Sequence, residues 1–216
     1  TVTMKLQPAI VTLHLLGGVT LLALLVWLAL RESPPVEVDP AAVGLRGLAA
    51  VSLAILYLQI ALGGWVSSNY AVLACTDFPL CQGRWLPDAD FAAGYTLWRP
   101  LGMDGAGSAI PFQALVAIHW THRTFALLVF AVLGVLARKA WRLVGLERLA
   151  RGLAALLVLQ FLTGLSNIVL DWPLLLAVLH NGGAAALVAV LVGINLRCAQ
   201  AARRPLGASS QGRLAG

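Results

Sequence analysis

The sequence contains very little charge. Only 11 % of its 216 residues are Asp, Glu, Lys or Arg, whereas 60 % are hydrophobic and the mean hydropathy is +0.86. A soluble domain carries about 25 % charged residues, so this deficit excludes an ordinary soluble protein and predicts an integral membrane protein. The net charge of +6 does not indicate nucleic-acid binding. The basic residues cluster at the ends of apolar runs and form no basic face with interleaved aromatic side chains.

Five apolar runs are long enough to cross the roughly 30 Å hydrocarbon core of a membrane as helices. We expect these helices at Ala9–Leu30, Gly47–Val66, Phe112–Ala137, Leu149–Leu170 and Leu174–Leu196. Only residues 171–173 separate the last two runs, so these two helices must be antiparallel neighbours. The sequence therefore predicts an all-α integral membrane protein with five transmembrane helices and a long loop at residues 67–111.

A weak internal repeat relates the second run to the fourth. LQIALGG at 58–64 and LQFLTGL at 159–165 both have Leu-Gln followed four residues later by Gly, and the next run carries a His in each case. We expect residues 47–197 to form one antiparallel four-helix bundle from two such helix pairs. We expect residues 1–46 to be an orphan helix and linker from a truncated N-terminal bundle, because the two helix pairs leave the first run over and the chain opens at Thr1 without an initiator Met. Residues 198–216 form a polar tail.

Lys and Arg are distributed unequally between the two ends of the runs. Eleven fall at one end, whereas only Lys5, Arg84 and Arg99 fall at the other. The positive-inside rule places the first end in the cytoplasm. We therefore expect a multi-pass protein of the bacterial inner membrane, with a cytoplasmic C-terminus and a periplasmic 67–111 loop.

Cysteine is scarce, with three residues in the chain. Cys75 and Cys81 lie close together in the outer loop, within ACTDFPLCQG, where an oxidising compartment favours a disulfide. A metal pair or two free thiols are the alternatives. We expect Cys198, at the cytoplasmic end of the last run, to be a free thiol without a role.

The five runs contain no Asp or Glu, yet they contain His and Arg. The third run holds His119, His122 and Arg123, the first holds His14 and the fifth holds His180. Ionisable side chains are costly at membrane depth, so they usually mark a site for a ligand, an ion or a proton. The sequence therefore places a candidate site within the membrane.

His14, His122 and His180 lie at one depth. They precede the basic end of their runs by 17, 16 and 17 residues, which is about 24–26 Å along a helix. Haem iron takes axial imidazoles from facing helices of a bundle, whereas zinc or copper needs a further His, Cys or carboxylate ligand nearby. The alternative for each His is a hydrogen bond to a neighbouring helix.

Small residues follow two of these histidines. Gly17–Gly18 come after His14, and Gly182–Gly183 come after His180. Such pairs provide flat space for a porphyrin, or they simply allow helices to pack closely.

Arg123 and His119 complete the set of candidate residues. The guanidinium of Arg123 matches a haem propionate, or it extends to lipid headgroups or loop carbonyls instead. His119 lies one turn before His122 on a similar face. We expect His119 to support the site, with iron ligation as the alternative.

The sequence resembles the haem A synthase family, in particular the C-terminal half of its proteobacterial form. The matching stretches are TVTMKLQPAIVTLHLLGG, LQIALGGWVSSNYAVLACTDFPLCQGRWLP, AIHWTHR, LQFLTGLSN and AVLHNGGAA. The resemblance implies an eight-helix membrane oxidoreductase built from two similar four-helix bundles. Such an enzyme oxidises a methyl group of haem O to the formyl group of haem A by successive hydroxylation.

The resemblance also implies residue roles. His122 and His180 match the axial iron ligands of a haem b, His14 matches a histidine on the side of the substrate haem, and Cys75 and Cys81 match a cysteine pair of the outer loop. The family's catalytic Glu and three of its helices have no counterpart here. We therefore expect this chain to bind haem but not to catalyse the oxidation by itself. The implied partners are membrane lipid, haem O, the farnesyltransferase that makes haem O, an unidentified electron acceptor and, in an oligomer, a second copy of the chain.

Two other functions are compatible with part of this pattern. A membrane electron-transfer cytochrome of the b type would carry histidine pairs in both halves and would need no long outer loop. A structural or transport bundle would bind no haem.

Overall fold

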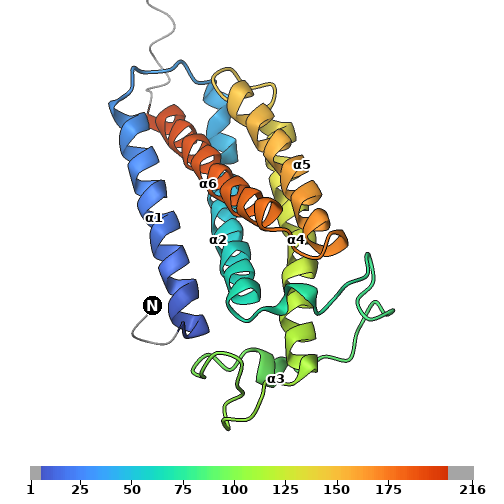
Figure 1. Ribbon diagram of the computed structural model, residues 1–216. Coiled ribbons are helices and arrows are strands. Elements are labelled where there is room, and N and C mark those ends of the chain that lie inside the picture. The colour runs from blue at the N-terminus through green and yellow to red at the C-terminus, as the bar shows by residue number, and fades with distance from the viewer. Residues whose placement is uncertain (1–5, 204–216) are drawn as a thin grey trace, which may run out of the picture.

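The computed structural model describes residues 6–203, and its regular elements over that range are all helices. The other residues, which include Lys5 and most of the expected tail, lie outside the described residues. Five helices are long and apolar enough to cross a membrane (Figure 1). They are α1 (Pro8–Glu32), α2 (Arg46–Ser68), α4 (Phe112–Ala140), α5 (Glu147–Val169) and α6 (Leu174–Arg203). The predicted fold class is confirmed.

Most helix ends follow from local chemistry. α1 begins at Pro8, whose fixed φ and missing N–H suit the first turn of a helix. It stops at Ser33, which precedes a proline and is extended, as that position favours. α6 differs from the prediction, because it continues to Arg203 where we expected a tail from residue 198. Cys198 and Ala201 are buried, so packing extends the helix; Cys198 is a free thiol.

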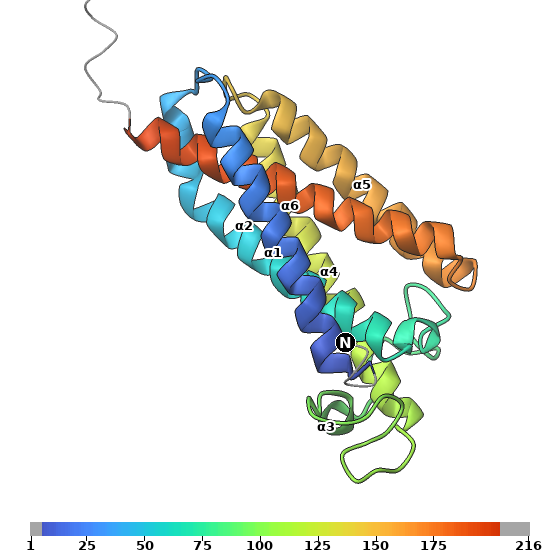
Figure 2. The same cartoon turned by 60° about the vertical axis from the view of Figure 1, so that its left-hand side comes forward.

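α2, α4, α5 and α6 form a four-helix bundle, and α1 lies outside it against α2 and α6 (Figures 1 and 2). Around the bundle, α2 packs on α4, α4 on α5, α5 on α6 and α6 on α2. Within residues 6–203, α4 and α6 share no close backbone contact. These two helices are therefore diagonal partners across the bundle.

The bundle is packed tightly at only one end. Its main apolar core joins the second half of α4, the first half of α5 and the second half of α6, and includes Leu136, Leu153 and Leu191. Asn195 ties this region together by donating to the carbonyl of Ala49 on α2 at 3.0 Å. Towards residues 169–174, α5 and α6 diverge from the other helices (Figure 2), and large apolar side chains there are exposed. The open end is the end that contains the histidines.

An ordered loop covers the start of α4. It carries two short helices, η2 (Ala71–Leu73) and α3 (Phe91–Gly94), and the predicted disulfide between Cys75 and Cys81, with an S–S distance of 1.95 Å. Arg99 is 1 % exposed and donates to the side-chain oxygen of Asn69 at 2.6 Å and to the carbonyl of Met103 at 2.8 Å. Burial lowers the pKa of Arg99, while the charge of Asp104 opposes that shift.

Candidate functional site

His122 on α4 is held by two residues of α2. The amide nitrogen of Gln59 donates to the backbone carbonyl of His122 at 3.2 Å and lies 3.1 Å from its Nδ1. Gly63, one turn further along α2, faces the imidazole, because a Cβ at this glycine would lie 3.0 Å from His122 Cε1. A side chain at position 63 would therefore displace the imidazole.

His180 on α6 is held in the same way by α5. The amide nitrogen of Gln160 donates to the backbone carbonyl of His180 at 2.8 Å. A Cβ at Gly164 would lie 3.3 Å from His180 Cε1. In addition, Oγ1 of Thr163 lies 2.9 Å from His180 Nδ1. The repeat seen in the sequence thus corresponds to two helix pairs in which a Gln and a Gly position the His of the next helix.

The two imidazoles come from diagonal helices. α4 and α6 both pack on α2 and on α5 and, within the described residues, not on each other. His122 stands on α4 and His180 on α6. Both side chains are partly buried and lie towards the open end of the bundle.

The predicted glycine pairs do not have one common role. The space beside Gly183 is filled by the amide of Gln160, which could not reach the carbonyl of His180 past a larger residue. Close packing therefore explains Gly183. Gly182, Gly17 and Gly18 have no atom within 4 Å of where a Cβ would stand, so these three positions face open space.

Arg123 connects α4 to the disulfide loop. Its Nη2 donates to the carbonyls of Pro79 and Leu80 at 3.3 and 3.1 Å, and its guanidinium carbon lies 5.4 Å from the centre of the Phe78 ring. These contacts agree with the alternative that Arg123 extends to loop carbonyls. Its Nη1, however, is buried and has no hydrogen-bond partner among residues 6–203. One donor of this cation is therefore left for another group.

The tip of the same loop is fixed by Asp77. Its two carboxylate oxygens accept from the backbone N–H groups of Gln82 and Gly83, both at 2.8 Å. Burial raises the pKa of this carboxyl, but the hydrogen bonds and the nearby charge of Arg123 outweigh burial and leave the pKa below its ordinary value. Asp77 therefore remains ionised at neutral pH.

His119 is 3 % exposed and is engaged by the loop, because its Nδ1 accepts from the backbone N–H of Cys75 at 3.2 Å. This contact anchors the disulfide to α4, which favours the supporting role over iron ligation. His14 lies elsewhere. It is exposed on α1, whereas Thr12 and Leu15 on the same helix face Gly64 of α2. The structure does not bring His14 to the other histidines.

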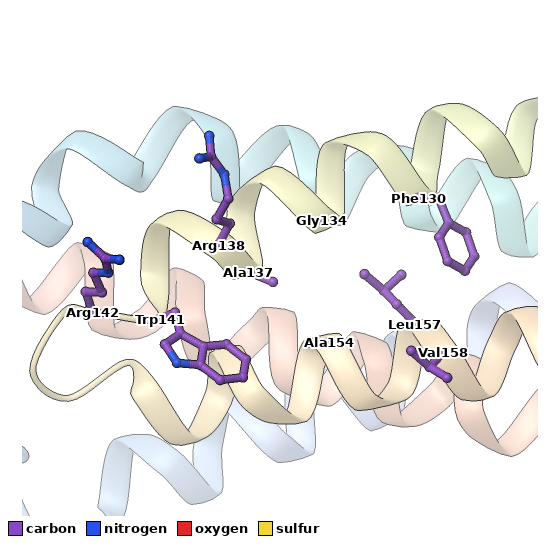
Figure 3. Close-up of a pocket in the computed structure, with 9 residues that line it drawn as sticks. All are labelled: Phe130, Gly134, Ala137, Arg138, Trp141, Arg142, Ala154, Leu157 and Val158. Atoms are coloured by element: carbon purple, nitrogen blue, oxygen red, sulfur yellow. The ribbon is translucent and has the colours of Figure 1, made fainter.

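One hollow in the described part of the chain lies away from the histidines, none of which lines it. It has a volume of about 560 Å³ and lies between α4 and α5 near their basic ends (Figure 3). It is lined by Phe130, Gly134, Ala137, Arg138, Trp141, Arg142, Ala154, Leu157 and Val158. In the described part of the chain, no three His, Cys, Asp or Glu side chains gather as a metal site. The imidazoles of His122 and His180 stay the predicted pair of donors for a metal.

The residues around that pair fit a haem. Two imidazoles on diagonal helices suit the two axial positions of iron, and large apolar side chains are exposed at this end of the bundle. Gly63 and Gly164 allow the imidazoles to lie against their supporting helices. The free donor of Arg123 suits a carboxylate.

A model of the COX15-CtaA family, described as cytochrome oxidase assembly protein, matches residues 1–192. The chain belongs to this family. A protein of Shewanella oneidensis named "Heme A synthase" is 43 % identical over 197 residues, which cover 90 % of this chain and 60 % of that protein. A "Heme A synthase" of Caulobacter vibrioides is 35 % identical over 208 residues, 93 % of this chain and 55 % of that protein. The chain thus spans 55 to 60 % of the length of these two relatives.

The family match covers every candidate site residue, from His14 to His180. Sequence reasoning found these histidines, Arg123 and the cysteine pair. It noted Gln59 and Gln160 only as part of a repeat and assigned them no role. It missed Thr163, because the corresponding residue of the first copy is Leu62 and the repeat therefore carries no signal there.

Proposed function

We propose that this chain is the haem b-binding part of a haem A synthase, an enzyme that oxidises a methyl group of haem O to the formyl group of haem A. The names of the relatives support the activity. The observation that carries the proposal is the repeated Gln–Gly–His arrangement on diagonal helices. Because the chain spans only part of its relatives, the oxidation is proposed for the whole protein and not for residues 1–216 alone.

In this proposal His122 and His180 are the axial ligands of a haem b. A haem held by these two imidazoles would supply the transfer of one electron. The residues of this chain keep the ligands in place. Gln59 holds the backbone of His122, and Gln160 holds the backbone of His180. Because Gly63 and Gly164 have no side chain, the imidazole rings can lie against α2 and α5. Ligands held by rigid helices move little when the charge of the site changes.

Arg123 binds a propionate in this proposal. Its Nη2 already holds the disulfide loop, so its Nη1 is the donor that remains. A charge-assisted hydrogen bond to a carboxylate is about twice as strong as a neutral one. Arg123 and His119 together then link the disulfide loop to the helix that carries His122.

The remaining assignments follow from the sequence. Residues 1–46 belong to an N-terminal bundle for the substrate haem, where His14 and the open space beside Gly17 and Gly18 serve that haem. Residues 47–197 form the haem b bundle. The excess of basic residues at one end supports a protein of the bacterial inner membrane with that end on the cytoplasmic side and the Cys75–Cys81 loop in the periplasm. The farnesyltransferase that makes haem O and a second copy of the chain are the proposed partners.

Expression of the complete protein in a bacterium that makes haem O but no haem A tests the activity. We expect haem A among the extracted haems for the wild type, and none for the His122→Ala variant. Gly134→Ala is a suitable control, because a Cβ there meets no atom within 4 Å. A complete protein that binds haem b but yields no haem A would contradict the synthase and favour the electron-transfer cytochrome.

A further inference from the structure

Among residues 6–203, Thr163 is the one hydroxyl with a hydrogen bond to a predicted ligand. It lies on α5, is 4 % exposed, and its Oγ1 is 2.9 Å from Nδ1 of His180. The same oxygen lies 2.8 Å from the carbonyl of Leu159, four residues earlier on the helix, to which it donates. Thr163 therefore has a partner on each side, one an acceptor and one an imidazole nitrogen.

The protons at this site can be counted. A threonine hydroxyl has one proton to donate and two lone pairs that accept. The carbonyl of Leu159 can only accept, and when the proton is donated to it, the hydroxyl oxygen accepts from His180. The Nδ1 of His180 then carries the proton of the neutral imidazole, and Nε2 carries the free lone pair. If Thr163 donated to Nδ1 instead, Nε2 would carry the proton of the neutral imidazole and would have no lone pair for a metal.

We propose that Thr163 is a positioning residue that holds His180 in the tautomer with the proton on Nδ1, which directs Nε2 to the iron and lowers the reduction potential of the haem. This inference rests on the proposed function, because it needs His180 as a ligand. An acceptor at the remote N–H of a ligating histidine fixes its tautomer and raises its basicity. A more basic ligand stabilises ferric over ferrous iron, so the hydroxyl lowers the potential.

The other half of the bundle has no such device. Leu62 stands on α2 where Thr163 stands on α5, since each follows the repeated Gln by three residues. The amide nitrogen of Gln59 lies 3.1 Å from His122 Nδ1 and 3.4 Å from its Nε2, so this contact does not select one tautomer of His122. A hydroxyl thus controls the tautomer of His180 and not that of His122, so the two predicted ligands differ in the hydrogen-bond partner of their Nδ1.

The test is a redox titration of the purified, haem-loaded protein, followed by its optical spectrum. Thr163→Val replaces the hydroxyl by a methyl group of similar volume, and we expect an upward shift of the midpoint potential with the haem retained. Thr163→Ser restores a hydroxyl and should return the potential to the wild-type value. Ser166→Ala is the matched control on the same helix. Ser166 also donates to a carbonyl four residues earlier, at 2.7 Å, but it has no hydrogen bond to a histidine.

The outcomes separate this inference from the proposed function. A Val variant with the wild-type potential, or a Ser variant shifted as far as the Val variant, would overturn the role of the hydroxyl while leaving the haem site intact. Should the Val variant take up no haem, the Ser variant decides. A Thr163→Ser variant with the haem content and midpoint potential of the wild type supports the inference, and a Thr163→Ser variant that binds no haem refutes it. A wild type that binds no haem refutes both the inference and the haem site.

Discussion

Gln160 reaches from α5 across to α6 and donates its side-chain N–H to the backbone carbonyl of His180, at 2.8 Å. The carbonyl oxygen of a helical residue has a second lone pair, so it accepts this bond without giving up the helix. The absence of a side chain at Gly183 makes the approach possible. α5 and α6 are thus joined at the level of the histidine, although their surroundings there are loosely packed.

Loss of this bond should destabilise the open end of the bundle. We expect Gln160→Leu to lower the free energy of unfolding by about 0.6 kcal/mol, the average for a polar contact between membrane helices. Denaturant titration in detergent micelles measures the change. Gln113→Leu is the control, because Gln113 is exposed at the start of α4. Equal stabilities of the two variants would contradict a role for the Gln160 contact.

Methyl groups at the two glycines that the copies of the repeat share should affect haem binding unequally. A Cβ at Gly63 would lie 3.0 Å from the imidazole of His122, whereas at Gly164 it would lie 3.3 Å from that of His180. The first distance requires the ring to move further. We therefore expect Gly63→Ala to lose more bound haem than Gly164→Ala, with Gly134→Ala at the wild-type level. The absorbance ratio of haem to protein reports this order, and a reversed order would count against the arrangement.

Reduction of the disulfide should loosen the outer loop. The bond joins cysteines six positions apart, and closing a loop of that size is worth about 2 kcal/mol in the chain-entropy model. We expect the Cys75→Ser, Cys81→Ser double variant to unfold at a lower temperature than the wild type and to be insensitive to reductant. Cys198→Ser should keep the sensitivity to reductant, since Cys198 is a free thiol. If the wild type melts at the same temperature with and without reductant, the disulfide does not contribute to its thermal stability and the prediction is wrong.

The sequence predicted the parts of this fold that depend on hydropathy alone. The five apolar runs became helices whose ends differ from the expected ones by a few residues, and α6 differed most. Its extension to Arg203 was not foreseen, because it depends on the burial of Cys198 and Ala201 by other helices. The one-turn helix α3 and the buried Arg99 were likewise not predictable, since loop contacts leave no periodic pattern.

The sequence indicated the ionisable residues of the candidate site but not its neutral ones. His122, His180 and Arg123 are conspicuous because a charged or titratable side chain is rare in an apolar run. Gln160 and Thr163 are ordinary residues of a helix, and their role comes from the position of α6 against α5. The sequence also could not separate Gly182 from Gly183, which differ only in what the neighbouring helix places beside them.

We propose that His122 and His180 bind one haem between the diagonal helices α4 and α6. The most direct measurement is the optical spectrum of the purified chain, oxidised and reduced, for the wild type and for the His122→Ala, His180→Ala and His14→Ala variants. The account predicts a low-spin haem b spectrum in the wild type and in His14→Ala, and its loss in each of the other two variants. An unchanged spectrum in both His122→Ala and His180→Ala would contradict the account.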